Sequence, residues 1–358
     1  MLDTIRHIMA YVAIMLAVLR FFIGDVLRYD TGILTVFIAF VILLSIDYRH
    51  FRFKHYLIAA IGIVLSVLNP NLLPIILLVL ICVVAKDLCV HKVAIICFIM
   101  QLIFLYYMYY KISVGEIVVH KVNYEKALTY DFGFGNSNTF AMFMYSAILC
   151  AYIAFWKRLN ICFLFLIFLV SYIVYLYAFG RTVFVSELIF ICSIVIAELG
   201  GRKILHKIKY WLALFPLFAL VSFLFIIFNF QEYELLNELL TGRIILWTEY
   251  IATYMELNVW IGADVVSIVD KPLDNSYITL LVYLGIIGYA LYAYLLFRGI
   301  SKGFEYLNKC KYVPFVISIL ICGMIENILV SYYPANIIFM LMMYKGAYCM
   351  ETKQMHIA

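Results

Sequence analysis

Long runs of consecutive apolar residues follow one another along almost the whole chain, separated by short charged segments. A helix needs roughly 20 apolar residues to cross the hydrocarbon core of a bilayer. The runs are continuously apolar, whereas the strands of a membrane barrel alternate. Hydrophobic residues make up 67% of the 358 positions and charged residues 13%, which is too much apolar surface for a water-soluble fold of this size. The sequence therefore predicts an all-α, polytopic integral membrane helix bundle.

We expect about twelve spanning helices in one membrane domain covering residues 1–358. They are expected near residues 7–24, 31–47, 56–69, 71–85, 93–110, 138–156, 159–179, 182–198, 210–229, 276–297, 312–330 and 335–350. The third and fourth flank Asn69-Pro70-Asn71 and could instead form one re-entrant hairpin. Two long polar segments remain, near residues 111–138 and 231–275, and we expect short helices in the second.

The distribution of Lys and Arg predicts the orientation. If the N-terminus is cytoplasmic, every basic cluster falls in a cytoplasmic loop, including Arg202-Lys203. This predicts cytoplasmic N- and C-termini and places both long polar segments outside. The net charge of +5 then reflects basic loops that face the cytoplasm. The lipid bilayer is therefore an expected partner, and no nucleic-acid partner is expected.

No pattern indicates a metal or another cofactor. The nine cysteines include no C-x-x-C pair, and those inside apolar runs are expected to pack as small apolar side chains. Of the seven histidines only His120 falls in an expected outer loop. We therefore predict no metal and no cofactor.

Arg181 interrupts an apolar run that is long enough for two spans. A tight turn at Phe179-Gly180-Arg181-Thr182 is expected, with Gly180 supplying a positive φ. Arg181 then lies at the first turn of the next span, at the outer surface. It either reaches lipid head groups or binds an anion, since its guanidinium matches phosphate geometry.

Arg243 is predicted to lie in the first turn of a helix from about 242 to 257, capped by Thr241. Apolar residues at 244, 245, 247, 251, 254 and 255 give this helix one face that can lie on the bundle. A cation is disfavoured at a helix start, so a neighbouring anion is expected. That anion is either a bound ligand or a carboxylate such as Glu249 or Glu238.

Three further polar groups fall on the same outer side. Asp274-Asn275-Ser276 either caps the next span or supplies a carboxylate that accepts a proton. The stretch Asp131–Thr139 is either a turn with a cap or a set of amides suited to sugar hydroxyls. Glu326 lies on the outer side and Glu187 lies within the span expected at 182–198; such ionisable groups at or near membrane depth usually face a cavity or a partner.

Five motifs follow one another between roughly residues 123 and 327: Phe134-Gly135-Asn136-Ser137-Asn138-Thr139, Gly180-Arg181-Thr182, Thr241-Gly242-Arg243-Ile244-Ile245-Leu246-Trp247, Asp274-Asn275-Ser276-Tyr277-Ile278 and Leu284-Gly285-Ile286-Ile287-Gly288. Together and in this order they resemble the O-antigen polymerase (Wzy) and O-antigen ligase superfamily.

The resemblance implies a metal-independent, inverting glycosyltransferase of the bacterial plasma membrane, acting on the extracytoplasmic face. Its substrate would be an oligosaccharide on undecaprenyl diphosphate, and its product a capsule, exopolysaccharide or O antigen. Arg181 and Arg243 would hold the diphosphate, with Asp274 as the third catalytic residue. Substrate contacts are also expected from Asn136, Asn138, Asn275, Tyr277 and Glu326. A chain-length regulator and a flippase of the same pathway are the partners that the resemblance implies.

Two alternatives remain. Ligases of the superfamily carry His-Asn where this chain has Asp274-Asn275, which favours a polymerase over transfer of finished chains to a final acceptor. Gly180 and Ser137 also depart from the serine and proline often found there. A lipid-linked oligosaccharide flippase is the other alternative, but its charges should lie deep along a central path.

Overall fold

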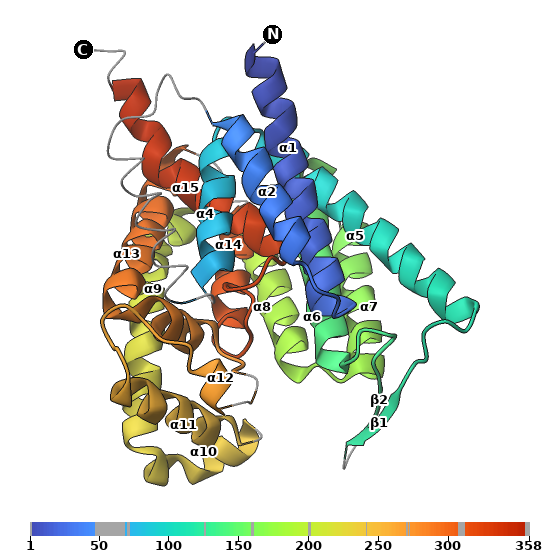
Figure 1. Cartoon of the computed structure of the whole chain (residues 1–358), viewed down its shortest axis with the longest axis vertical. Coiled ribbons are helices and arrows are strands. Elements are labelled where there is room, and N and C mark those ends of the chain that lie inside the picture. The colour runs from blue at the N-terminus through green and yellow to red at the C-terminus, as the bar shows by residue number, and fades with distance from the viewer. Residues whose placement is uncertain are drawn as a thin grey trace.

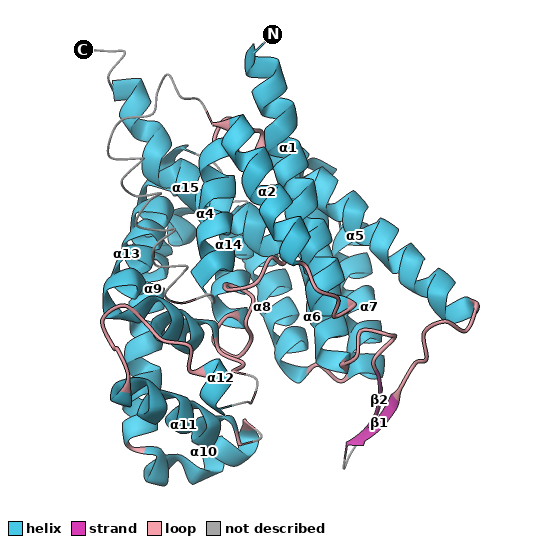
Figure 2. Cartoon of the chain, viewed as in Figure 1, coloured by secondary structure: helices cyan, strands magenta, loops and turns pink. Residues whose placement is uncertain are grey.

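The computed structural model describes residues 2–46, 69, 72–124, 127–158, 161–199, 202–240, 242–269, 271, 273–306 and 312–354. Within these ranges the chain is almost entirely helical, with one two-stranded antiparallel hairpin (Figure 2). The longer helices are α1 (Leu2–Phe21), α2 (Gly32–Ser45), α4 (Leu73–Val84), α5 (Val90–Ser113), α6 (Ser137–Phe155), α7 (Ile161–Ala178), α8 (Arg181–Glu198), α9 (Arg202–Phe228), α11 (Arg243–Glu256), α13 (Ser276–Tyr306), α14 (Val313–Cys322) and α15 (Pro334–Gln354). The shorter elements are the π-helical turn η1 (Phe22–Val26), the 3₁₀ turns η4 (Trp156–Arg158) and η5 (Phe230–Tyr233), α10 (Glu234–Leu239), α12 (Val266–Val269), and strands β1 (Lys121–Tyr124) and β2 (Ala127–Tyr130).

The prediction of a membrane helix bundle agrees with these elements. Within the described ranges, six helices are long and apolar enough to cross a membrane, in α1 with η1, α5, α6, α7, α9 and α13. Shorter apolar helices, α2, α4 and α14, lie among them. The expected third span falls almost wholly outside the described residues, and the number of twelve spans stays a prediction.

Two ends of the bundle differ in character (Figure 1). Helix α1 begins and α15 ends at one end, and the hairpin β1–β2 and helices α10 and α11 lie at the other. Helix α13 packs against both α9 and α15, α5 packs against α6, and α8 packs against α14. The second polar segment therefore folds into short helices at the end of the bundle opposite to the beginning of α1.

Two expected spans have different limits in the structure. The span expected at 312–330 is helical only as α14, which stops at Cys322, and turns follow as far as Ser331. Helix α13 is interrupted at Gly285, which has φ 66° and ψ 178°. A Cβ there would lie 2.4 Å from the backbone oxygen of Trp260, so only glycine permits this close approach.

Helix α11 lies on the bundle through one apolar face, as its sequence predicts. Ile244, Trp247, Ile251 and Tyr254 are buried together with Tyr250, whereas Ile245 and Met255 of the expected face are more than half exposed. The Trp247 ring packs edge-on against Phe223 of α9, with 5.1 Å between the ring centroids. This contact fixes the helix whose first residue is Arg243.

Candidate functional site

A cavity of about 570 Å³ lies among helix ends that are far apart in the sequence. The start of α6, the turn between α7 and α8, the α10–α11 junction, the segment before α13 and the turn after α14 form its wall. Its lining residues are Thr129, Asn136–Asn138, Ala178–Thr182, Val185, Ser186, Leu239, Leu240, Arg243, Asp274, Ile321, Ile325 and Glu326. Six of the eight residues predicted to form a site therefore share this cavity.

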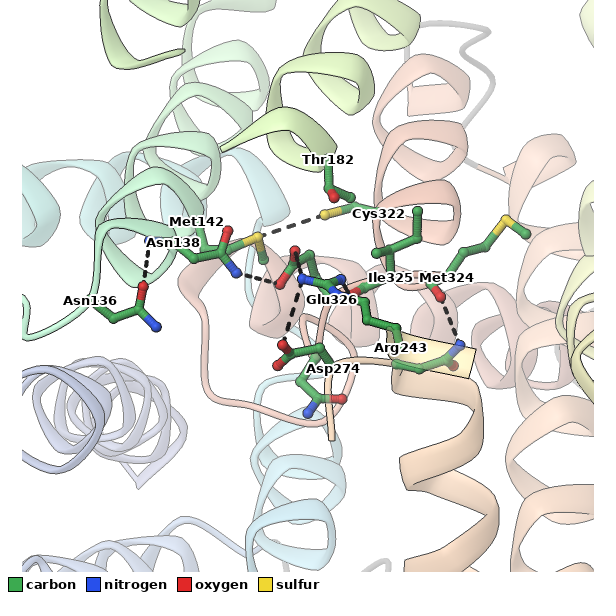
Figure 3. A network of polar contacts seen from close by, with 12 residues as sticks. Asn136, Asn138, Met142, Thr182, Arg243, Asp274, Cys322, Met324, Ile325 and Glu326 are labelled. Carbon is green, nitrogen blue, oxygen red and sulfur yellow. Dashed lines mark hydrogen bonds and ion pairs between the residues drawn. The ribbon is translucent and has the colours of Figure 1, made fainter. Parts of the chain in front are cut away.

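Arg243 is held between two carboxylates (Figure 3). Its Nη2 atom lies 3.6 Å from Asp274 Oδ2 and 3.5 Å from Glu326 Oε1, and its Nη1 donates a 2.6 Å hydrogen bond to the carbonyl of Ile325. The anion expected beside this cation thus includes two carboxylates of the protein. Glu249, an alternative partner in the sequence, pairs instead with Lys271 at 2.7 Å.

Glu326 is the most deeply buried ionisable group in the cavity wall, with its side chain 4% exposed. Asn138 Nδ2 donates a 2.8 Å hydrogen bond to its Oε2, and Oε1 has no hydrogen-bond partner among the described residues. Burial raises the pKa of Glu326 to about 7; Arg243 opposes the rise, nearby Asp274 adds to it, and the Asn138 hydrogen bond opposes it. The carboxyl can therefore change its protonation state near neutral pH.

Asp274 occupies a wetter position, with its side chain 36% exposed. Burial raises its pKa above the ordinary value, and the charge of Arg243 opposes this rise. Two carboxylates of unequal burial, Asp274 and Glu326, thus lie beside the same arginine.

The residues that follow Asp274 hold the turn that carries Glu326. Ser276 Oγ donates to the carbonyl of Glu326 at 2.6 Å and accepts from the Leu329 amide at 3.1 Å. Asn275 Nδ2 donates to the Met324 carbonyl at 2.7 Å. These bonds tie the segment before α13 to the turn after α14, so the backbone positions of Asp274 and Glu326 depend on each other.

Two of the predicted substrate-binding residues, Asn275 and Tyr277, do not line the cavity. Both are fully buried. Asn275 Oδ1 accepts the amides of Tyr277 and Ile278 and so caps α13, the alternative left open by the sequence. The Tyr277 hydroxyl donates to the Leu320 carbonyl at 2.7 Å. Both side chains are thus hydrogen-bonded to backbone groups and not directed into the cavity.

Arg181 lies where the sequence predicts, as the first residue of α8, and its side chain is exposed. The reason given for Gly180 is wrong, however, since its φ is −73° and Phe179 is the residue in the left-handed region, with φ 53°. A Cβ at Gly180 would lie 2.8 Å from Ala141 Cβ. Gly180 is thus required because α6 passes close to this turn.

Asn136 and Asn138 have separate roles at the start of α6. Asn136 Oδ1 accepts the Asn138 amide at 2.8 Å and caps the helix, and its side chain also reaches the cavity. Asn138 directs its own amide group to Glu326 (Figure 3). The capping and the site alternatives for this stretch are therefore compatible.

Sequence reasoning missed a capping residue and part of the lining. The α11 N-cap position is Gly242, and Asn237 Oδ1 accepts the amides of Ile244 and Ile245, whereas the expected cap Thr241 lies outside the described residues. Thr182 and Ser186 line the cavity beside Arg181. Thr182 and Ser186 are four residues apart and so share one face of α8, a spacing that could have indicated them.

A search of the described residues finds no group of three or more His, Cys, Asp or Glu side chains that could hold a metal ion. Comparison with known proteins found no matching family model, no matching curated protein and no matching solved structure. Function must therefore be argued from the site itself.

Proposed function

We propose that this chain is a glycosyltransferase of the bacterial plasma membrane that polymerises oligosaccharide repeat units carried on undecaprenyl diphosphate. The observation that carries the proposal is one cavity lined by two arginines, Arg181 and Arg243, together with two carboxylates, Asp274 and Glu326. This combination provides cations for a diphosphate and a proton acceptor for a hydroxyl. The resemblance of the motifs to polysaccharide polymerases supports the same reaction class.

In this proposal the arginines bind the diphosphate of the donor. A guanidinium fork matches phosphate oxygens, and the N-terminal end of α8, where Arg181 lies, carries a partial positive charge. As the bond from the anomeric carbon to the diphosphate breaks, negative charge develops on the leaving oxygen, and nearby cations stabilise it. The two carboxylates beside Arg243 hold its side chain at the wall of the cavity.

The cavity volume is appropriate for this use. Pockets for small ligands commonly enclose about 300–1,000 Å³, and 570 Å³ accommodates a diphosphate with neighbouring sugar. Asn136 and Asn138 bring amide groups, which pair well with sugar hydroxyls. Apolar residues such as Val185, Leu239 and Ile321 form part of the same wall and suit the start of a prenyl chain.

We further propose twelve spans, cytoplasmic termini and an extracytoplasmic cavity. Supporting this orientation, α1 begins and α15 ends at the same end of the bundle, away from α10 and α11 (Figure 1). Clusters of Lys and Arg also fall in the loops assigned to the cytoplasm. A flippase is less well supported, because its charged residues should lie deep along a central path. The four charged residues of the cavity lie instead at helix ends: Arg181, Arg243, Asp274 and Glu326.

The test is the size distribution of surface glycan in the host after gene deletion and complementation. Arg181→Ala and Arg243→Ala, at normal membrane abundance, are expected to leave single repeat units on the final acceptor, as deletion does. Lys271→Ala is the matched control, since it removes another cation, which pairs with Glu249 and does not line the cavity. Long chains stranded on the lipid carrier after deletion would identify a ligase, and an unchanged ladder would contradict the proposal.

A further inference from the structure

We propose that Glu326 is the group that takes the proton from the acceptor hydroxyl, while Asp274 stays ionised and positions Arg243. This assignment rests on the proposed glycosyl transfer and changes the role of Asp274, which the sequence suggested as the proton acceptor. It follows from the unequal surroundings of two carboxylates that share one arginine.

The two oxygens of Glu326 have different partners. Asn138 fixes Oε2 through a 2.8 Å hydrogen bond, whereas Oε1 is buried without a hydrogen bond within the described ranges. Its ion pair with Arg243, at 3.5 Å, is longer than an N–H···O hydrogen bond. A buried acceptor left in this state is unfavourable, and an incoming hydroxyl would satisfy it. Movement of Arg243 toward a bound diphosphate would open access to Oε1.

Asp274 is suited to the other role. Its side chain is 36% exposed, against 4% for Glu326, so its ionised form loses less hydration, and it lies 3.6 Å from Arg243. Two titratable groups whose surroundings separate their protonation behaviour commonly divide the roles of proton carrier and permanent charge. By this criterion the buried carboxyl carries the proton and the wetter one remains charged.

Several elements contribute titratable or charged groups around Glu326. They are Arg243 at the start of α11, Asp274 before α13, Cys322 at the end of α14 and Tyr333 before α15. A thiol and a phenol are ordinarily neutral near pH 7, so the two charged neighbours are Arg243 and Asp274. Burial exceeds the attraction of Arg243 and raises the pKa of Glu326 to about 7, close to the working pH of a general base.

The reaction step then balances in atoms and charge. The acceptor oxygen forms a bond to the anomeric carbon of the donor as its proton passes to Glu326 Oε1. The bond from that carbon to the diphosphate oxygen breaks, and its electron pair leaves with the diphosphate. The proton on Glu326 is afterwards released to water, which restores the carboxylate.

The test compares Glu326→Gln, Glu326→Asp and Asp274→Asn in the purified full-length protein, measuring turnover and binding of a prenyl-diphosphate-linked repeat unit separately. We expect Glu326→Gln to lower kcat by at least about 100-fold with donor affinity within about threefold of wild type. Glu326→Asp, which keeps a carboxyl group, should recover part of kcat. Asp274→Asn should chiefly weaken donor binding, because Arg243 loses a positioning partner.

The pH dependence separates a proton acceptor from a structural residue. Wild-type turnover should rise with pH through about 7, where Glu326 ionises. Removing the negative charge of Asp274 stabilises ionised Glu326, so in Asp274→Asn the rise of turnover should move to lower pH. In Glu326→Gln, which has no carboxyl group at this position, the rise should be absent. If Glu326→Gln kept the wild-type kcat, or the wild-type rise of turnover with pH, the assignment of Glu326 would be overturned. That result would leave the proposed glycosyl transfer in place. A wild-type protein that neither binds the donor nor polymerises would instead overturn the proposed function.

Discussion

Asn138 Nδ2 donates a 2.8 Å hydrogen bond to Glu326 Oε2 and thereby joins the first turn of α6 to the turn after α14. The bond stabilises the ionised carboxylate, because an amide N–H is a better partner for a charged oxygen than for a neutral one. The bond is also one of the contacts that set the pKa of the Glu326 carboxyl group.

Asn138→Ala should therefore raise the pKa of Glu326. A hydrogen bond to a charged group contributes about 1.5–3 kcal/mol, so the acid limb of turnover should move up by about one to two pH units. Asn138→Asp should move it further, since a second carboxylate repels the first. Turnover measured from pH 5 to 9 checks both variants. Identical limbs in wild type and Asn138→Ala would remove this bond from the mechanism.

Arg243→Ala should destabilise the protein in a pH-dependent way. Without Arg243 the folded-state pKa values of Glu326 and Asp274 rise further above their unfolded values, so stability is lost as pH increases through those folded values. Removing one partner of a buried ion pair can cost about 3 kcal/mol, and we expect a loss of this order at pH 8.5 that shrinks at pH 6. Thermal unfolding in detergent at both pH values measures it.

Arg181→Ala serves as the comparison for stability, because that side chain is exposed. It should leave the unfolding temperature nearly unchanged at both pH values and lower donor affinity. Equal destabilisation by the two arginine variants would argue against the carboxylate pairing of Arg243.

Gly180→Ala should disturb the packing of α8 on α6. The added Cβ would lie 2.8 Å from Ala141 Cβ, and overpacking of this kind costs about 1–3 kcal/mol. Because Gly180 has a negative φ, backbone strain adds nothing to this cost. The double variant Ala141→Gly with Gly180→Ala should recover most of the loss, measured as coupling in a double-mutant cycle. Strict additivity of the two substitutions would contradict the contact.

Asn237→Ala should loosen the start of α11. Its Oδ1 accepts the amides of Ile244 and Ile245, and loss of a helix cap costs about 1 kcal/mol. Asn237→Asp keeps the acceptor and adds a charge favoured at a helix start, so it should retain wild-type stability. Hydrogen exchange at Ile244 and Ile245 provides the readout. Faster exchange in both variants would show that another group caps the helix.

The positions of most helices could be predicted from the sequence because hydropathy is a local property. The apolar runs correspond closely to α5, α6, α7 and α8, and the amphipathic pattern after Gly242 predicted α11. The prediction failed where polar contacts between distant segments decide the backbone. Helix α14 stops at Cys322, and the turns that follow are held by Asn275 and Ser276, although this stretch appeared long enough to continue.

The candidate site could be predicted in part for the same reason. Arg181, Arg243, Asp274 and Glu326 were conspicuous as charged residues in or beside apolar runs, since charge is expensive there. Nothing in the sequence indicated that Asn275 and Tyr277 would turn inward and bond to the backbone of α14 and the turn that follows it. The hairpin β1–β2 was also missed, because four-residue strands give a weak signal beside long apolar helices.

The residue pattern alone predicts apolar helices and a few charged residues that need partners. The identity of those partners depends on how the helices and turns pack against one another. Arg243 meets Glu326 because α11 packs on α9 while the turn after α14 is tied to the segment before α13. The hydropathy of a residue is known from its identity alone. The protonation of Glu326, by contrast, depends on burial and on charges contributed by several helices.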